Sequence, residues 1–153
     1  MRWDGKVIDI KSHTSKEKIA GGVDVTIEDA GYKETGAWAD SGLPGYKGGK
    51  SRFSGKGGSA VFASPLNKAG EYTVYIYRVA HPSNDARQGI VINNGGGSES
   101  LVVDMRMGPS GWVELGSYAF KGTKKEGVVV KPGSGISPAR CSALMFVLAT
   151  PER

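Results

Sequence analysis

A glycine-rich stretch with several cations, Gly45-Tyr-Lys-Gly-Gly-Lys-Ser-Arg-Phe53, has the composition of a loop that holds phosphate. A phosphate-binding P-loop needs a glycine, four further residues and then Gly-Lys-Ser, placed between a strand and a helix. The position required to be glycine is Pro44, so the spacing fails by one residue. The residues after Arg52 are typical of strand and turn, so no helix N-terminus follows to hold the anion. The stretch is therefore not a nucleotide-binding loop of this type.

Nucleophilic and zinc chemistry have little support in this sequence. The only histidines are His13, in a polar segment, and His81, in a loop before a proline. Cys141 is the single cysteine, so it can form neither an intrachain disulfide nor a thiolate zinc cluster, and we expect it to be a small buried residue. No Gly-x-Ser-x-Gly elbow is present either. We therefore predict no catalytic residue and no enzyme activity.

Carboxylates are more numerous, and three of them, Asp24, Glu28 and Asp29, lie close together in the sequence. A glycosidase needs two carboxyl groups held across a sugar, but the sequence does not pair these. The simpler interpretation is a strand-ending turn in which a side chain bonds the backbone. A structural calcium site built from these oxygens is the alternative, and the sequence leaves any metal ligands undetermined.

The chain carries a formal net charge of +5, and much of the excess lies in two groups. Such groups favour polyanionic partners, although a solvated face that keeps the protein soluble explains them equally well. The two groups are Lys47, Lys50, Arg52 and Lys56, and Lys121, Lys124 and Lys125.

The elements that must position these side chains are short β-strands separated by turn residues. Alternating apolar and polar residues, glycine-rich turns and the absence of an amphipathic helix predict an all-β protein, an antiparallel β-sandwich. The 153 residues favour one domain over residues 23–150, after a polar leader or linker over residues 1–22. The expected strands cover residues 23–28, 59–63, 70–80, 88–93, 99–106, 112–120, 127–131 and 142–148.

Four segments, in order, are similar to the golvesin C-terminal-like, or xanthan-lyase-type, carbohydrate-binding domain. They are an Asp-x-Gly-aromatic turn with Gly-x-Trp at residues 29–38, Gly-Tyr-x-Gly with Arg-Phe at 45–53, Ala-Gly-x-Tyr-x-Val-Tyr at 69–75, and Gly-Trp-x-x-Leu-Gly-x-Tyr-x-Phe at 111–120, which resembles the family's Gly-x-Trp-x-x-Leu-Gly-x-Tyr-x-Phe strand. The resemblance implies a jelly-roll β-sandwich that accompanies polysaccharide lyases, other secreted hydrolases and some flavin-dependent oxidoreductases. It also implies non-catalytic glycan binding as the usual role.

Two positions depart from the family pattern. Ser142 stands where the last strand of the family carries an aspartate, and Asn93-Asn94-Gly95-Gly96 replaces a His-His-Gly-Gly-like turn. Any role of that carboxylate, including support of a metal, is therefore in doubt for this chain.

The candidate ligand-binding residues combine aromatic rings, on which sugars stack, with cations for acidic sugars. The central hypothesis is a shallow cationic site on the 45–53 loop, where Tyr46 and Arg52 touch the sugar and are dispensable for stability. Trp38 and Trp112 are explained more simply by core packing than by ligand contact. Tyr75 and Tyr77 share a strand face that is either core or an open platform. The full set of candidates is Tyr46, Lys47, Lys50, Arg52, Trp38, Tyr75, Tyr77, Arg78 and Arg87.

Three function classes fit these features. The first is a non-catalytic module that binds an anionic polysaccharide and is accessory to a larger secreted enzyme, whose other domains are its partners. The second is a structural or protein-interaction domain of a multidomain enzyme that binds no glycan. The third, a nucleic-acid binder that stacks bases on Tyr46 and Phe53, is the least favoured because no nucleic-acid fold motif is present.

The expected location is outside the cell or at its surface, as part of a larger exported protein. The first residues contain no apolar core of signal-peptide length, and no run approaches the length of a membrane span. A membrane partner is therefore not expected.

Overall fold

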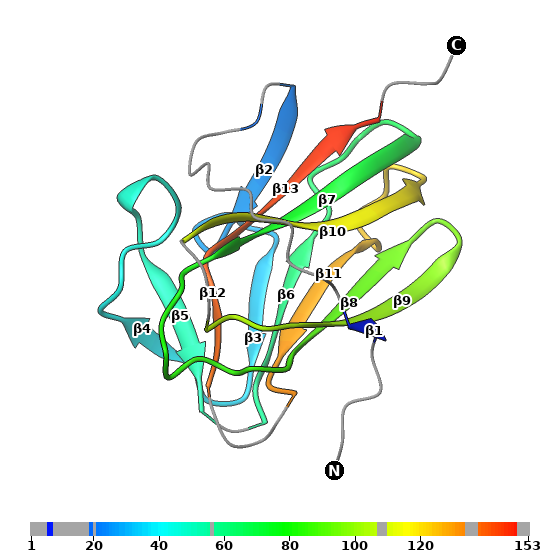
Figure 1. Cartoon of the computed structure of the whole chain (residues 1–153). Coiled ribbons are helices and arrows are strands. Elements are labelled where there is room, and N and C mark those ends of the chain that lie inside the picture. Colours follow the sequence, from blue (N-terminus) through cyan, green and yellow to red (C-terminus); the bar gives the residue numbers. More distant parts are fainter. Residues whose placement is uncertain are drawn as a thin grey trace.

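The computed structural model describes residues 6–7, 19, 21–55, 57–106, 110–133 and 138–149, and strands dominate them (Figure 1). The only helical segment in these ranges is a 3-10 turn, η1 (Tyr46–Gly48). No helix in this part of the chain is long and apolar enough to cross a membrane. The strands are β1 (Lys6–Val7), β2 (Gly22–Thr26), β3 (Tyr32–Thr35), β4 (Ala39–Ser41), β5 (Ser51–Ser54), β6 (Ser59–Ala63), β7 (Gly70–Arg78), β8 (Gln88–Asn94), β9 (Gly97–Val103), β10 (Gly111–Phe120), β11 (Gly127–Lys131), β12 (Ala139–Cys141) and β13 (Ala143–Leu148).

Two sheets form the layers of a β-sandwich (Figure 1). One sheet has six strands in the order β1-β9-β8-β11-β6-β3, and the other has four in the order β10-β7-β13-β2. Neighbouring strands pair antiparallel throughout both sheets, except that β1 lies parallel to β9. The antiparallel β-sandwich predicted from the sequence is confirmed.

A third, three-stranded sheet of order β12-β5-β4 lies at one side of the sandwich (Figure 1). The chain passes directly from β12 to β13 through Ser142, so it leaves the small sheet and enters the four-stranded sheet at this residue. The small sheet therefore fixes where the 45–50 loop, which precedes β5, lies relative to β13.

The main core fills the space between the two large sheets. Its residues come from alternate positions of the strands, as the period of two requires. In β7, for example, Tyr72, Val74 and Ile76 face the main core, as their alternation predicts. Phe62 and Phe146 are fully buried there as well. The alternation of apolar residues is thus what defines the sandwich.

A second, smaller apolar cluster covers the outer face of the four-stranded sheet. It contains Tyr77 and Trp112, paired across β7 and β10, together with Tyr46 from the loop. Tyr77 is 3% exposed and Trp112 fully buried, whereas Tyr75 is only partly buried. The structure therefore places Tyr77 in an apolar core and not on an open platform. Trp112 is also a core residue, as the sequence favoured.

Several short strands, β3, β4, β5 and β12, were not among the segments expected from the sequence. They have three or four residues, and polar side chains occupy much of their length. Such segments carry little β-propensity, so the pairing partner decides their conformation. The longer expected strands are present with shifted ends: β2 stops at Thr26, β7 at Arg78 and β9 at Val103.

Only part of the expected leader over residues 1–22 can be followed. Lys6 and Val7 pair with Leu101 and Val102 at the edge of the six-stranded sheet, and Gly22 begins β2. Residues 1–5, 8–18 and 20 lie outside the described residues, as does His13.

Candidate functional site

The loop of residues 45–50 is a tight turn that glycines make possible. The Gly45 N–H donates to the Gly49 carbonyl at 2.7 Å, and the Gly48 N–H donates to the Gly45 carbonyl at 3.1 Å. A Cβ atom at Gly45 would overlap the hydroxyl of Ser142 and the carbonyl of Lys50. Lys47 has a φ of 57°, and no other non-glycine residue in the described ranges lies in this left-handed region. The backbone therefore holds Lys47 at the tip of the turn at some conformational cost.

Ser142 clamps this loop to the sandwich. Its hydroxyl accepts a hydrogen bond from the Tyr46 N–H at 2.9 Å and donates one to the Lys50 carbonyl at 3.3 Å. Its own carbonyl accepts the Ile27 N–H at 3.1 Å. At 2% exposure, the side chain makes these bonds away from solvent. The residue between β12 and β13 thus organises both the 45–50 loop and the turn after β2.

Tyr46 supports the loop from below. The residue is 5% exposed, and its ring centroid lies 4.8 Å from that of Trp112 and 5.6 Å from that of Tyr77. Its hydroxyl donates to Asp24 Oδ2 at 3.1 Å. A stacking platform must leave one face of the ring open to the ligand, and a ring that is 5% exposed offers none, so Tyr46 anchors the loop instead of stacking on a sugar.

The turn after β2 brings two carboxylates to the surface. The Thr26 N–H donates to Asp29 Oδ2 at 2.7 Å, and the Glu28 N–H donates to Thr26 Oγ1 at 3.1 Å. This is the strand-ending turn with side-chain hydrogen bonds that the sequence predicts. Glu28 and Asp29 are both exposed.

A cleft of about 300 Å³ lies between this turn and the 45–50 loop. Lys47 and Lys50 line one side of it, and Glu28 and Asp29 line another. Ammonium groups donate hydrogen bonds and carboxylates accept them, so the cleft can bond a ligand rich in hydroxyl or acidic groups. Its complete lining is Asp24, Thr26, Ile27, Glu28, Asp29, Tyr46, Lys47, Gly49, Lys50 and Ser142.

Arg52, although it belongs to the same sequence stretch, faces a different environment. Its guanidinium donates to both oxygens of Glu34 at 2.7 Å and to Asp40 Oδ1 at 3.0 Å. These bonds lower the pKa of the Glu34 carboxyl and, with Glu34 as the main partner, raise the pKa of the guanidinium. Burial and the neighbouring Cys141 raise the pKa of Tyr32, which donates to Glu34 Oε2 at 2.7 Å. Arg52 therefore joins β5 to β3 and β4 and does not line the cleft.

The other candidates lie outside the cleft as well. Trp38 donates its Nε1–H to the Thr35 carbonyl at 3.1 Å and packs against the main core. Arg78 is 1% exposed in β7, and burial lowers the pKa of its guanidinium. Arg87 is partly buried next to Asp85, which accepts its N–H at 2.9 Å. The structure thus brings together Tyr46, Lys47 and Lys50 from the predicted set.

Sequence reasoning did not assign Asp24, Glu28, Asp29 and Ser142 to the ligand site. The first three were considered only for catalysis or calcium, and Ser142 only as a departure from the family pattern. The signal that could have joined them is Gly45, next to Tyr46, because a glycine often marks a place where another part of the chain approaches the backbone closely. Its partner, Ser142, lies 96 residues from Tyr46 along the chain, so the sequence alone does not reveal it.

Within the described residues, no group of three or more His, Cys, Asp and Glu side chains comes together as a metal site. Asp24 and Asp29 each accept a hydrogen bond from the protein, as described above. The calcium site therefore stays a prediction, with no carboxylate cluster in this part of the chain to hold the ion. Cys141 is 1% exposed, as expected, and burial raises the pKa of its thiol to about 12.

Comparisons with known proteins agree with this fold. The sequence profile of the Golvesin C-terminal domain family matches residues 23–135. No curated protein is significantly similar to the chain. Among solved structures, the xanthan lyase of Paenibacillus is 22% identical with a TM-score of 0.78, over 88% of this chain and 14% of that one.

Two further enzymes share the fold less closely. The exo-β-1,3-galactanase of Phanerochaete chrysosporium, solved with galactose, is 19% identical with a TM-score of 0.61, over 84% of this chain and 30% of that one. The GH26-CBM35 β-(1,4)-mannanase of Podospora anserina is 17% identical with a TM-score of 0.62, over 87% and 29%. This chain spans less than a third of each of these three proteins.

Proposed function

Because this chain belongs to the golvesin C-terminal domain family, we propose that it is a non-catalytic module that binds a glycan in the cleft between Lys47 and Asp29. The observation that carries the proposal is the lining of that cleft. It combines exposed ammonium donors with exposed carboxylate acceptors on a backbone that Ser142 holds in place. Sugar hydroxyls both donate and accept, so such a site bonds them without rearranging.

The preferred glycan is anionic. Lys47 and Lys50 lie on the same short loop, and the chain as a whole has a net charge of +5. The carboxylates of Glu28 and Asp29, on the opposite side of the cleft, accept hydrogen bonds from sugar hydroxyls. They also repel the acidic groups of a glycan, which are therefore held on the lysine side. An acidic polysaccharide fits the cleft if its acidic groups face the lysines while its hydroxyls face Glu28 and Asp29.

The module serves a larger exported enzyme that acts on a polysaccharide. Solved proteins with the same fold include a xanthan lyase, a galactanase and a mannanase, and in each the matching region is a minor part of the chain. Polymeric glycans are too large to cross a cell membrane unaided, so such an enzyme acts outside the cell or at its surface. Asp24 and Asp29, each bonded to a protein donor, suit binding more than proton transfer.

Affinity electrophoresis tests the proposal, in gels that contain xanthan, polygalacturonate or a neutral galactan, with and without calcium. Any basic protein is retarded by a polyanion, so the control must carry the same charge. We therefore compare the double variant Lys47→Ala, Lys50→Ala with Lys121→Ala, Lys125→Ala, whose exposed lysines do not line the cleft. The variant Lys47→Ala, Lys50→Ala is expected to lose its retention in gels that contain an acidic polysaccharide. The variant Lys121→Ala, Lys125→Ala is expected to keep most of its retention. Equal retention of the two variants contradicts the cleft as the binding site.

A domain that contacts other domains and binds no glycan is the second candidate function. It is favoured by the outer face of the six-stranded sheet, where Val61, Val129 and Val91 lie side by side across β6, β11 and β8. Val61 is 37% exposed and the other two are partly exposed. This candidate expects the wild-type chain to migrate without specific retention in every gel.

A further inference from the structure

A second cavity, of about 420 Å³, adjoins the cleft. Asp24 and Asp29 line both spaces, so the two spaces lie next to each other at these residues. The second cavity is further lined by Val25, Ala30, Gly31, Ala63, Ser64, Pro65 and Lys124.

The walls of this cavity are held by backbone hydrogen bonds. The Ala63 N–H donates to the Gly31 carbonyl at 3.0 Å, which joins the end of β6 to the turn after β2. A Cβ atom on Gly31 would lie 3.1 Å from the Ala63 Cβ, so glycine permits this close contact. The Ser64 N–H donates to the Glu126 carbonyl at 2.8 Å and ties the same wall to the loop that carries Lys124.

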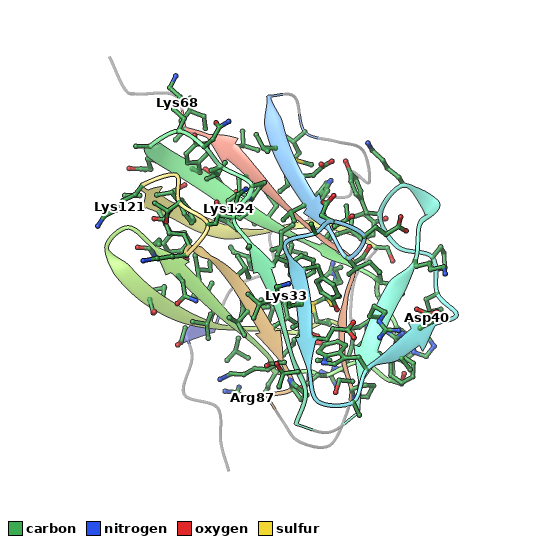
Figure 2. The ribbon with its side chains drawn as sticks, turned by 180° about the vertical axis from the view of Figure 1, so that it is seen from behind. Lys33, Asp40, Lys68, Arg87, Lys121 and Lys124 are labelled. Carbon is green, nitrogen blue, oxygen red and sulfur yellow. The ribbon has the colours of Figure 1, made fainter. Side chains whose placement is uncertain are left out.

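Glu126 fixes that loop. Its carboxylate, in a residue only 7% exposed, accepts the N–H groups of Lys121, Gly122 and Thr123 at 2.8, 3.0 and 2.9 Å. Burial opposes ionisation, but these three bonds lower the pKa of the carboxyl, so the clamp stays charged at neutral pH. Lys124 is therefore an exposed cation on a pre-ordered backbone, and Figure 2 shows it set apart from Lys121.

The chemistry of the second cavity complements that of the first. Ala30, Ala63 and Pro65 give it a mostly apolar wall, which suits the C–H face of a sugar ring. Lys124 adds one cation to the second cavity, whereas Lys47 and Lys50 line only the first. Asp29, between the two spaces, has an exposed carboxylate that can accept a hydroxyl from a ligand in either one.

We propose that the two cavities are adjoining subsites for consecutive residues of one acidic glycan chain, with Lys47 and Lys50 serving the first residue and Lys124 the second. This inference rests on the proposed function. The glycan is therefore bound along its length, as an internal segment of a polymer or an oligosaccharide, and not as a single sugar.

The experiment compares Lys124→Glu with Lys125→Glu. Both lysines are exposed neighbours and both changes alter the net charge equally, but only Lys124 lines the cavity. Dissociation constants come from retardation in gels of graded xanthan or polygalacturonate concentration. Urea unfolding of both variants confirms that they fold as the wild type does.

Lys124→Glu is expected to weaken binding about tenfold more than Lys125→Glu, the effect of one charge-assisted hydrogen bond. Equal weakening by the two variants overturns the second subsite. If Lys47→Ala, Lys50→Ala still lowers affinity in that case, the cleft stands and only the subsite fails. If neither Lys124→Glu nor the cleft double variant differs from its control, the proposed function falls as well.

Discussion

The backbone N–H of Tyr46 donates to the hydroxyl of Ser142 at 2.9 Å, across 96 positions of the sequence. The same hydroxyl donates to the Lys50 carbonyl, so one buried side chain holds both ends of the loop that lines the cleft. Ser142, which departs from the aspartate of the family pattern, therefore has a structural role of its own.

Replacing Ser142 by alanine is expected to destabilise the fold by about 1–3 kcal/mol, because it leaves the buried Tyr46 N–H and the Lys50 carbonyl without this partner. Urea unfolding measures the loss. Ser98→Ala is the matched control, since its exposed hydroxyl donates to the Asn93 side chain at the surface, and a change below about 0.5 kcal/mol is expected there. Equal midpoints for the two variants would show that the clamp contributes nothing to stability.

Tyr46→Ala is expected to cost about 3 kcal/mol or more, because it empties a buried position between Tyr77 and Trp112. Tyr46→Phe keeps the ring and loses the hydrogen bond to Asp24, so a cost of about 1 kcal/mol is expected. Thermal unfolding distinguishes the two. The sequence alone led us to expect an unchanged stability for Tyr46→Ala, and a melting temperature equal to that of the wild type would restore that view.

Arg52 should affect the pH dependence of stability rather than glycan binding. Its hydrogen bonds are the main cause that lowers the pKa of Glu34 below 4.5 in the folded state. A carboxyl with a lowered pKa stabilises the fold fully above its unfolded pKa, and the contribution is lost as the pH falls through the folded value. The stability difference between wild type and Arg52→Ala is therefore expected to be greatest near pH 7 and to shrink below about pH 4.5.

Chemical denaturation between pH 3 and pH 7 measures this difference. Lys125→Ala, which removes an exposed cation from a different loop, serves as the control for loss of a surface positive charge. Because Arg52 does not line the cleft, Arg52→Ala should keep the polysaccharide affinity of the wild type. A difference that stays constant down to pH 3, or a marked loss of affinity, would contradict this assignment.

Lys47 allows stability and binding to be separated. Its φ of 57° suits glycine, so Lys47→Gly should be more stable than Lys47→Ala by about 1 kcal/mol, while both lack the ammonium group. Both variants are then expected to bind acidic polysaccharide with the same reduced affinity. Denaturant midpoints and affinity gels provide the two readouts. If affinity instead follows stability, Lys47 acts through the shape of the loop and not through its charge.

Much of the fold could be predicted, because it follows from local patterns. The alternation in β7 places Tyr72, Val74 and Ile76 on one face, and the same periodicity identifies β6, β8, β10 and β11. The short strands β3, β4, β5 and β12 escaped prediction because their few residues adopt strand geometry only when a neighbour supplies the hydrogen bonds.

The candidate site divides in the same way. The sequence by itself determined that residues 45–50 form a glycine-rich cationic loop and that Thr26–Asp29 end a strand in a turn, because these are short-range properties of the backbone and its neighbouring side chains. Only the tertiary structure decided that Ser142 joins them into one cleft, that Tyr46 lies under the loop and that Arg52 pairs with Glu34. Those outcomes depend on contacts between residues far apart in the chain, and a side chain of a given type serves as core, ion pair or ligand contact according to what the fold places beside it.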